Sequence, residues 1–281
     1  MTLRLLLIGN SHLAAPKLGW DEIADQYPEV RCDFFGGPAN WIESAVFEHG
    51  VITVPVPSLA RKVAKVTGGP TSVAVADYDA IAFIGMRFGL APYMRQLSLL
   101  TLYDLGRTKA GFQIVSKSCL RQLLRDILAD TPAFRWSSMV AQASGKPVFL
   151  VPQPLSSEAR LAHDQLVRRH RNFKAQAAAW LAAFQSAARA LTAAKGLTLV
   201  EQPASTIAFP GFTRAELSRG SVRLLNNNSK HPELEFNHMN TAYGVELLHT
   251  LLAAVRSRVE PMPARAASKR ADQPGADALR G

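Results

Sequence analysis

The sequence predicts a three-layer α/β/α fold in which helices cover both faces of a mostly parallel sheet. Short apolar runs recur along the chain, and helical patterns or turn residues separate them. This alternation is typical of parallel sheets, whose buried strands are apolar on both faces. The runs expected as strands are Leu3 to Ile8, Val30 to Phe35, Tyr78 to Ile84, Pro147 to Val151 and Leu197 to Val200.

The first apolar run has two possible interpretations, a buried strand or a secretion signal. It ends at the sequence Gly9-Asn10-Ser11-His12, which makes it shorter than the roughly 7 to 15 apolar residues of a typical signal core. We therefore expect a strand and place the protein in the cytoplasm. No stretch approaches the roughly 18 to 20 uncharged apolar residues of a membrane span, so we expect none.

Two helical patterns stand out in the second half of the chain. The first spans about Ser157 to Lys195 and should end at Gly196, and the second spans Tyr243 to Arg258. Apolar residues repeat at helical spacing in both patterns. They are Phe173, Ala177, Trp180, Leu181, Phe184, Ala188 and Leu191 in the first helix, and Val245, Leu248, Leu252 and Val255 in the second.

A long segment between the third and fourth expected strands predicts a helical cap. It runs from about Arg87 to Ser144, and a helix is expected near Ser118 to Ala129. Ligands of open α/β sheets bind beyond the carboxyl ends of the strands, so this insertion should line or cover the site. We expect one domain over residues 1–259. Residues 260–281 lack apolar periodicity and should form a disordered basic tail.

The charge balance and the cysteines exclude several classes of protein. The chain has 32 Lys and Arg against 22 Asp and Glu, but the basic residues are scattered and not interleaved with aromatic ones, which argues against a nucleic-acid partner. The cluster Arg168 to Arg171 is expected on a solvated helix face. Cys32 and Cys119 are too few for a disulfide framework and are expected to be buried.

No cofactor or metal site is expected from the motifs in the chain. A dinucleotide fingerprint of the GxGxxG type is missing, as is a phosphate-binding GxxxxGK[ST] loop. The seven histidines include no HxH or HExxH spacing. His231, in the polar stretch before the C-terminal helix, is expected at the surface.

A serine and a histidine motif at the two ends of the chain suggest nucleophilic catalysis. Ser11 follows the first strand where a helix begins, which suits either a nucleophile or a simple helix cap. A serine hydroxyl needs a base, usually a histidine held by a carboxylate. Glu235 and His238 supply both, three residues apart, just before the last helix.

These two blocks resemble those of the GDSL/SGNH hydrolase family, over roughly residues 3 to 256. The resemblance implies a flavodoxin-like fold, with Ser11 as the nucleophile, His238 as the general base and then acid, and Glu235 orienting the imidazole. Its substrates would be small esters or O- or N-acyl groups, with carbohydrates as the class that the family often handles.

The middle blocks of the family correspond to positions that bind the oxyanion. Gly36 or Gly37 fits the glycine block, whereas Arg87 stands where the family has an asparagine, so it either donates to the oxyanion or binds an anionic part of the substrate. Asn40 could be a substitute donor. His12, beside the nucleophile, should line the pocket or pack into the first helix.

Three functions therefore remain open. The preferred one is a serine-dependent hydrolase of SGNH type. An acyltransferase would use the same residues and pass the acyl group to a hydroxyl other than water. The third function is a non-catalytic protein of the same fold that binds an anionic glycan or nucleotide.

Overall fold

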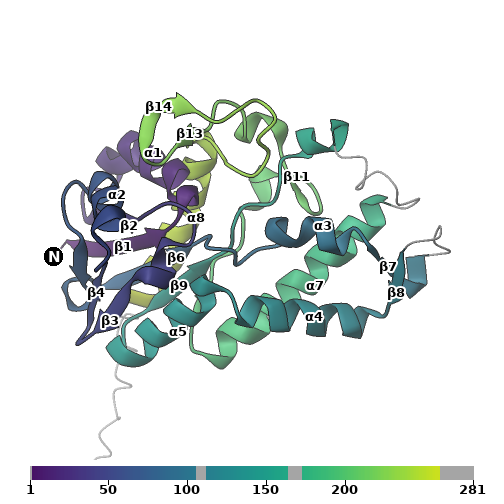
Figure 1. Ribbon diagram of the computed structural model, residues 1–281, viewed down its shortest axis with the longest axis horizontal. Coiled ribbons are helices and arrows are strands. Elements are labelled where there is room, and N and C mark those ends of the chain that lie inside the picture. The colour runs from purple at the N-terminus through teal and green to yellow at the C-terminus, as the bar shows by residue number, and fades with distance from the viewer. Residues whose placement is uncertain (1, 106–111, 164–172, 260–281) are drawn as a thin grey trace, which may run out of the picture.

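A parallel sheet of five strands forms the centre of the part of the protein that the computed structural model describes, residues 2–105, 112–163 and 173–259 (Figure 1). Every expected core strand is present, and the predicted α/β class is confirmed. The strands are β1 (Leu3–Gly9), β2 (Val30–Gly36), β6 (Ala80–Ile84), β9 (Val148–Val151) and β10 (Thr198–Leu199).

The strand order places a crevice at the end of β1. The order is β10-β9-β6-β1-β2, and all four pairings are parallel. Numbered along the chain, this is the 2-1-3-4-5 order of flavodoxin-like folds, in which the connections reverse direction between the first and third strands. Ser11 follows β1 and Gly85 follows β6, so both lie at this switch point.

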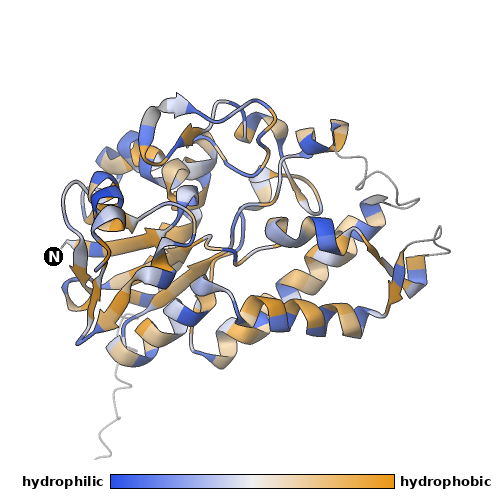
Figure 2. Ribbon diagram, in the orientation of Figure 1, coloured by the Kyte–Doolittle hydropathy of each residue, from blue (hydrophilic) through white to orange (hydrophobic). Residues whose placement is uncertain are grey.

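Helices cover both faces of the sheet, because the central strands are apolar on both sides (Figure 2). In β1, Leu5 and Leu7 pack against α1 and α8, whereas Leu6 and Ile8 belong to the core on the opposite face. The helices are α1 (Ala14–Ile23), α2 (Pro57–Thr67), α3 (Met94–Leu97), α4 (Lys117–Ala129), α5 (Pro132–Ser144), α7 (Phe173–Ala194) and α8 (Thr241–Val259).

Several short strands outside the core sheet were not anticipated. One antiparallel sheet precedes β6, β7 and β8 form a parallel pair, and two antiparallel pairs precede α8. They are β3 (Val46–Glu48), β4 (Val51–Thr53), β5 (Ser72–Ala74), β7 (Leu100–Leu102), β8 (Gln113–Val115), β11 (Ile207–Phe209), β12 (Phe212–Thr213), β13 (Val222–Arg223) and β14 (Asn226–Lys230).

The prediction that the long helix begins at Ser157 is wrong. Ser157 makes a β-bridge with Thr213, and Glu158–Ala162 is a 3₁₀ helix. The Ser157 amide donates to the carbonyl of Phe236, so this segment is tied to the loop that carries Glu235 and His238. Within the described residues the α-helix begins at Phe173. The cluster Arg168 to Arg171 and the expected tail, 260–281, lie outside them.

The buried stripes of the two long helices agree largely with expectation. Ala177, Trp180, Phe184, Ala188 and Leu191 of α7 are buried. In α8 the stripe is wider than expected: Leu248, Leu252 and Val255 are joined by four further buried residues, and Val245 is only partly buried. None of the helices in the described ranges combines the length and the apolar composition that a membrane span needs.

The segment expected as a cap divides into two parts. Its first part holds α3, β7, β8 and α4, and α4 packs against α7 in an arm beside the sheet (Figure 1). Its second part, α5, packs on β6 and β9 as an ordinary crossover helix, so the insertion ends near Ala129. Cys119 of α4 is exposed, contrary to expectation, because Leu120, Leu124 and Leu128 form the buried stripe; Cys32 is buried.

Helices α1 and α8 pack so closely that only glycine fits at their contact. A Cβ on Gly244 would lie 2.0 Å from the Ala15 carbonyl oxygen, and a Cβ on Gly19 would lie 2.7 Å from the Gly244 carbonyl carbon. Carbon atoms in contact are normally about 3.5 to 4.0 Å apart. The two helix backbones therefore touch, and any side chain at these positions would separate them.

Replacing Gly244 with alanine should lower the free energy of unfolding by about 1–3 kcal/mol, the usual cost of overpacking. In an unconstrained helix interior the same change raises the free energy of unfolding by roughly 0.5–1 kcal/mol. The sign of the measured difference therefore shows whether the two helix backbones touch. Urea unfolding measures the difference, with Thr250→Ala on α8 as the control. A stabilised Gly244→Ala variant would show that the two backbones are not in contact.

Candidate active site

Ser11 is held at the end of β1 by a tight turn. Asn10 caps the 3₁₀ helix Ser11–Leu13: its side chain accepts a hydrogen bond from the His12 amide at 3.3 Å, and its carbonyl accepts from the Leu13 amide at 2.9 Å. These bonds use the amides of His12 and Leu13 and not that of Ser11. The turn therefore holds Ser11 at the carboxyl edge of the sheet, and among the described residues no hydrogen bond engages its amide.

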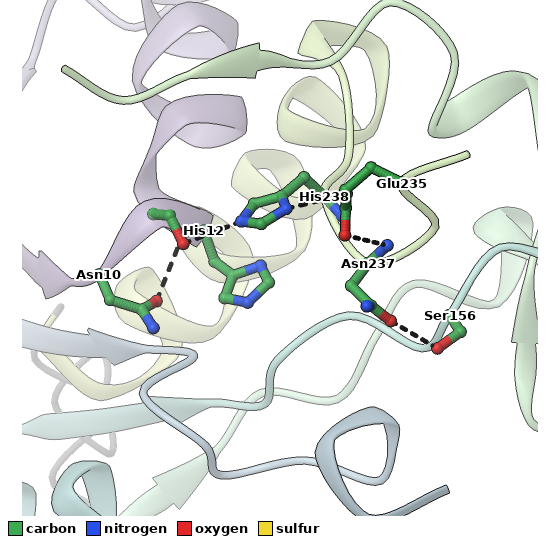
Figure 3. Close-up of polar contacts among 7 residues, drawn as sticks. Asn10, His12, Ser156, Glu235, Asn237 and His238 are labelled. Carbon is green, nitrogen blue, oxygen red and sulfur yellow. Dashed lines mark hydrogen bonds and ion pairs between the residues drawn. The ribbon is translucent and has the colours of Figure 1, made fainter. Parts of the chain in front are cut away.

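Ser11, His238 and Glu235 form a continuous chain of hydrogen bonds (Figure 3). His238 Nε2 lies 2.8 Å from Ser11 Oγ, and His238 Nδ1 lies 2.9 Å from Glu235 Oε2. A carboxylate only accepts hydrogen bonds, so Nδ1 carries the ring proton and Nε2 accepts from the serine hydroxyl. The distances match those expected for a nucleophile, a base and an orienting carboxylate.

The loop that carries Glu235 and His238 folds back on its own carboxylate. The amide of His238 donates to Glu235 Oε2 at 2.8 Å, and the amide of Asn237 donates to Oε1 at 3.1 Å. Burial raises the pKa of Glu235, but the hydrogen bonds and the charge interaction with His238, together with the two amides, outweigh it and bring the pKa to about 2. Glu235 is therefore ionised at neutral pH.

Contacts from three other segments hold this loop in place. Ser156 Oγ donates to Asn237 Oδ1 at 2.7 Å, next to the bond between the Ser157 amide and Phe236 (Figure 3). The Asn240 side chain donates to the carbonyls of Glu216 and Arg219 and accepts from the Tyr243 amide at the start of α8. The bracing by Ser156 and Ser157 carries no recognisable sequence signal, because it joins segments far apart in the chain, whereas an asparagine directly before a helix, like Asn240, is a typical helix cap.

The ring of His238 is stacked against two other histidines. The centroid of the His12 ring lies 4.8 Å away with an interplanar angle of 15°, and that of His231 lies 4.0 Å away with an angle of 10°. The expectation that His231 is a surface residue is therefore wrong. The sequence offers one signal for this contact: His231 lies only four residues before Glu235, and Pro232 between them favours a turn. In the structure the chain turns back there, with the Glu235 amide bonded to the Pro232 carbonyl.

The two flanking histidines favour the uncharged form. Burial, followed by the nearby His238, lowers the pKa of His12 to about 3. Burial and then His238 also lower the pKa of His231. Both rings are therefore neutral at neutral pH, so Glu235 is the charged partner of the His238 ring.

Three of the residues expected to bind the oxyanion, Gly36, Gly37 and Asn40, lie at the end of β2 and in the turn that follows it. The Gly37 amide donates to the carbonyl of Gly9 at 3.4 Å, a long hydrogen bond, and Gly36 packs so tightly on Gly9 that its Cβ would lie 2.5 Å from that carbonyl oxygen. Asn40 is exposed at the start of a 3₁₀ helix. Among the described residues no hydrogen bond joins either glycine amide or Asn40 to Ser11, and their role at the oxyanion stays a prediction.

Arg87 lies on a strained turn beside the serine loop. Met86 and Arg87 have φ values of 44° and 69°, and the Phe88 amide donates to the carbonyl of Gly85 at 3.0 Å. Non-glycine residues in this region cost about 1–3 kcal/mol each and cluster at functional sites. A Cβ on Gly85 would lie 3.0 Å from His12 Cδ2, so the turn contacts the site directly. The Arg87 side chain is exposed and hydrogen-bonds Tyr93.

His231, Glu235 and His238 also have ligand atoms within 4.8 Å of one another, but their arrangement does not suit a metal ion. An imidazole nitrogen binds zinc at about 2.0–2.1 Å along the plane of its ring. The rings of His231 and His238 lie face to face at 4.0 Å, so one ion cannot lie in both planes. Both nitrogens of His238 are already engaged by Ser11 and Glu235.

Comparisons with known proteins give distant structural similarity only. No protein-family model and no curated protein matches the sequence. The solved structures that resemble the chain include an extracellular lipase from Streptomyces rimosus, with 11% identity, a TM-score of 0.46 and coverage of 90% of this chain and 100% of the lipase.

Two further structures are similar over most of their length. A DUF4886 family protein from Bacteroides uniformis is 11% identical, with a TM-score of 0.39 and coverage of 95% of this chain and 88% of that one. A carbohydrate acetylesterase family member from Sinorhizobium meliloti is 10% identical, with a TM-score of 0.34 and coverage of 91% and 98%.

The low pKa of Glu235 predicts how the Glu235→Gln variant responds to pH. The folded-state pKa is depressed from 4.5 to about 2, so the carboxylate stabilises the fold above about pH 4.5, and this contribution is lost as the pH falls toward 2. The deficit in unfolding free energy of Glu235→Gln should therefore be largest at neutral pH and shrink below pH 4.5. Urea unfolding at pH 7, 5 and 3.5 measures it; a deficit that stays constant would contradict the shift.

Proposed function

We propose that the protein is a serine hydrolase that cleaves ester or acyl groups through an acyl-enzyme on Ser11. The observation that carries the proposal is the chain of hydrogen bonds from Ser11 Oγ through the His238 ring to Glu235, at 2.8 and 2.9 Å. Each group has the state that its role needs: an accessible hydroxyl, an imidazole that accepts at Nε2, and an ionised carboxylate.

The reaction follows from this arrangement. Ser11 Oγ attacks the acyl carbonyl carbon while its proton passes to His238 Nε2, and Glu235 stabilises the imidazolium. The Ser11 amide, at the N-terminus of the 3₁₀ helix, donates to the developing oxyanion. Collapse of the tetrahedral intermediate breaks the bond to the leaving alcohol, which takes the proton from Nε2. Water then attacks the acyl-serine by the reverse sequence of proton transfers and releases the carboxylic acid.

The acceptor and the substrate are separate parts of the proposal. An acyltransferase would use the same three residues and direct a substrate hydroxyl, in place of water, to the acyl-serine. Acylated carbohydrates are the substrate class that the family resemblance implies. Incubation with an acylated sugar and a second, unacylated sugar tests both points, because hydrolysis releases the free acid whereas transfer produces a newly acylated sugar.

Labelling with a fluorophosphonate probe tests the proposed nucleophile. The unchanged protein should be labelled, and both Ser11→Ala and His238→Ala should lose labelling, since the hydroxyl is unreactive without its base. We expect ester hydrolysis by either variant to fall by about 10⁴- to 10⁶-fold. Ser257→Ala, at the far end of α8, is the control and should label normally. Absence of labelling in the unchanged protein would contradict the proposal.

For Arg87 we propose substrate binding in place of an oxyanion contact, because its guanidinium is exposed and donates to Tyr93. Arg87→Asn should raise KM for an ester that bears a carboxylate or phosphate by roughly 10- to 100-fold, the value of a charged hydrogen bond, and leave neutral esters unaffected. Arg121→Asn, on the exposed face of α4, is the control. An equal loss of kcat for neutral and anionic esters would instead place Arg87 in the oxyanion hole.

A further inference from the structure

The two hydrogen bonds of His238 do not fix its ring completely. Ser11 and Glu235 hold the ring at Nε2 and Nδ1, two points that define an axis. Rotation about that axis would tilt the ring without breaking either bond. The Ser11 contact is also lost once the serine carries an acyl group. The side chain's own torsions about Cα–Cβ and Cβ–Cγ limit this tilt from the backbone side, where the His238 amide is bonded to Glu235, and contacts on the ring faces limit it further.

Stacked imidazoles supply this restraint on both faces of the ring. The His231 ring lies 4.0 Å from the ring of His238 and the His12 ring lies 4.8 Å from it, both nearly parallel to it. Two rings on the same face would also contact each other, and no ring contact joins His12 and His231 among the described residues. They therefore lie on opposite faces.

His231 is anchored independently of the residues it contacts. Its amide donates to the carbonyl of Ser221 at 2.8 Å, next to the start of the β13–β14 hairpin, and Lys230 before it pairs with Val222 in that hairpin. Its Nε2 is buried and has no hydrogen-bond partner within the described residues. The ring is therefore held by the hairpin and contributes an aromatic face to His238, not a hydrogen bond.

Burial first, and then the charges around His231, keep this face uncharged. The groups that face it are His238, Glu235 and Arg223, and the two basic groups oppose a proton on His231. On the other face, burial and then His238 oppose a proton on His12, as does His231, whereas Glu235 favours it. A neutral aromatic face is attractive to a cation, whereas a second imidazolium at 4.0 Å would repel the charge that His238 acquires during the reaction.

From these contacts we infer that His231 is a positioning residue for His238, which holds the plane of the base and presents an uncharged face to it throughout the reaction. The inference rests on the proposed function, since it assigns His231 a role only if His238 is the base. The role needs an aromatic ring at position 231, and it does not need a proton there.

The experiment compares His231→Ala and His231→Phe with the unchanged protein on p-nitrophenyl acetate. His231→Ala should lower kcat by about 10- to 100-fold with KM changed less than about twofold, because a base displaced by about 1 Å loses rate and not ground-state binding. His231→Phe retains an aromatic face and should recover kcat to within about threefold of the unchanged protein. His249→Ala, an exposed histidine of α8, is the control.

The pH profile separates positioning from a charge effect. If His231 is uncharged in the working enzyme, the acid limb of kcat for His231→Phe should coincide with that of the unchanged protein. A cationic His231 would hinder protonation of the base, so its removal would move the limb to higher pH. This comparison uses the phenylalanine variant alone and holds even if His231→Ala does not fold.

Two results would overturn the inference: a folded His231→Ala with unchanged kcat, or an acid limb displaced upward in His231→Phe. Thermal unfolding followed by circular dichroism verifies that each variant is folded. Failure of the proposed function looks different, because the unchanged protein itself would then show no labelling and no hydrolysis that depend on Ser11.

Discussion

The contact between the backbones of α1 and α8 is the constraint on which the proposed site depends. Ser11 and His238 are 227 positions apart in the chain, yet each lies three residues before one of these helices. Gly19 and Gly244 let the helices touch, so the two helix starts, and the loops that precede them, have a fixed separation. A wider crossing would move the imidazole away from the hydroxyl without altering either loop.

The electrostatics of the site follow from burial around one carboxylate. Glu235 stays ionised because the ring and amide of His238 and the amide of Asn237 donate to it. The neighbouring His12 and His231 stay neutral because burial disfavours their charged forms. In the proposed reaction the imidazolium on His238 therefore has one negative partner and two uncharged faces, an environment that stabilises a transient positive charge.

The sequence predicted those parts of the fold and site that local pattern determines. All five core strands lie in apolar runs, and β6 and β9 are buried throughout, so composition revealed them. The spacing of Glu235 and His238 predicted a hydrogen bond within one loop. The remaining features depend on distant segments. Ser157 stands at the start of a helical sequence pattern, but its amide is bonded to the carbonyl of Phe236, 79 positions away. His231 lies in a polar stretch, but its ring stacks on His238 because the chain turns back at Pro232.

The most direct test of the account is to trap the acyl-enzyme. Rapid acid quench during turnover of p-nitrophenyl acetate, followed by protease digestion and mass spectrometry, locates the acetyl group on the chain. We expect the acetyl group on Ser11, where it accumulates only while substrate is being consumed. Turnover without acetylation of Ser11, or with the acetyl group on another residue, would contradict it.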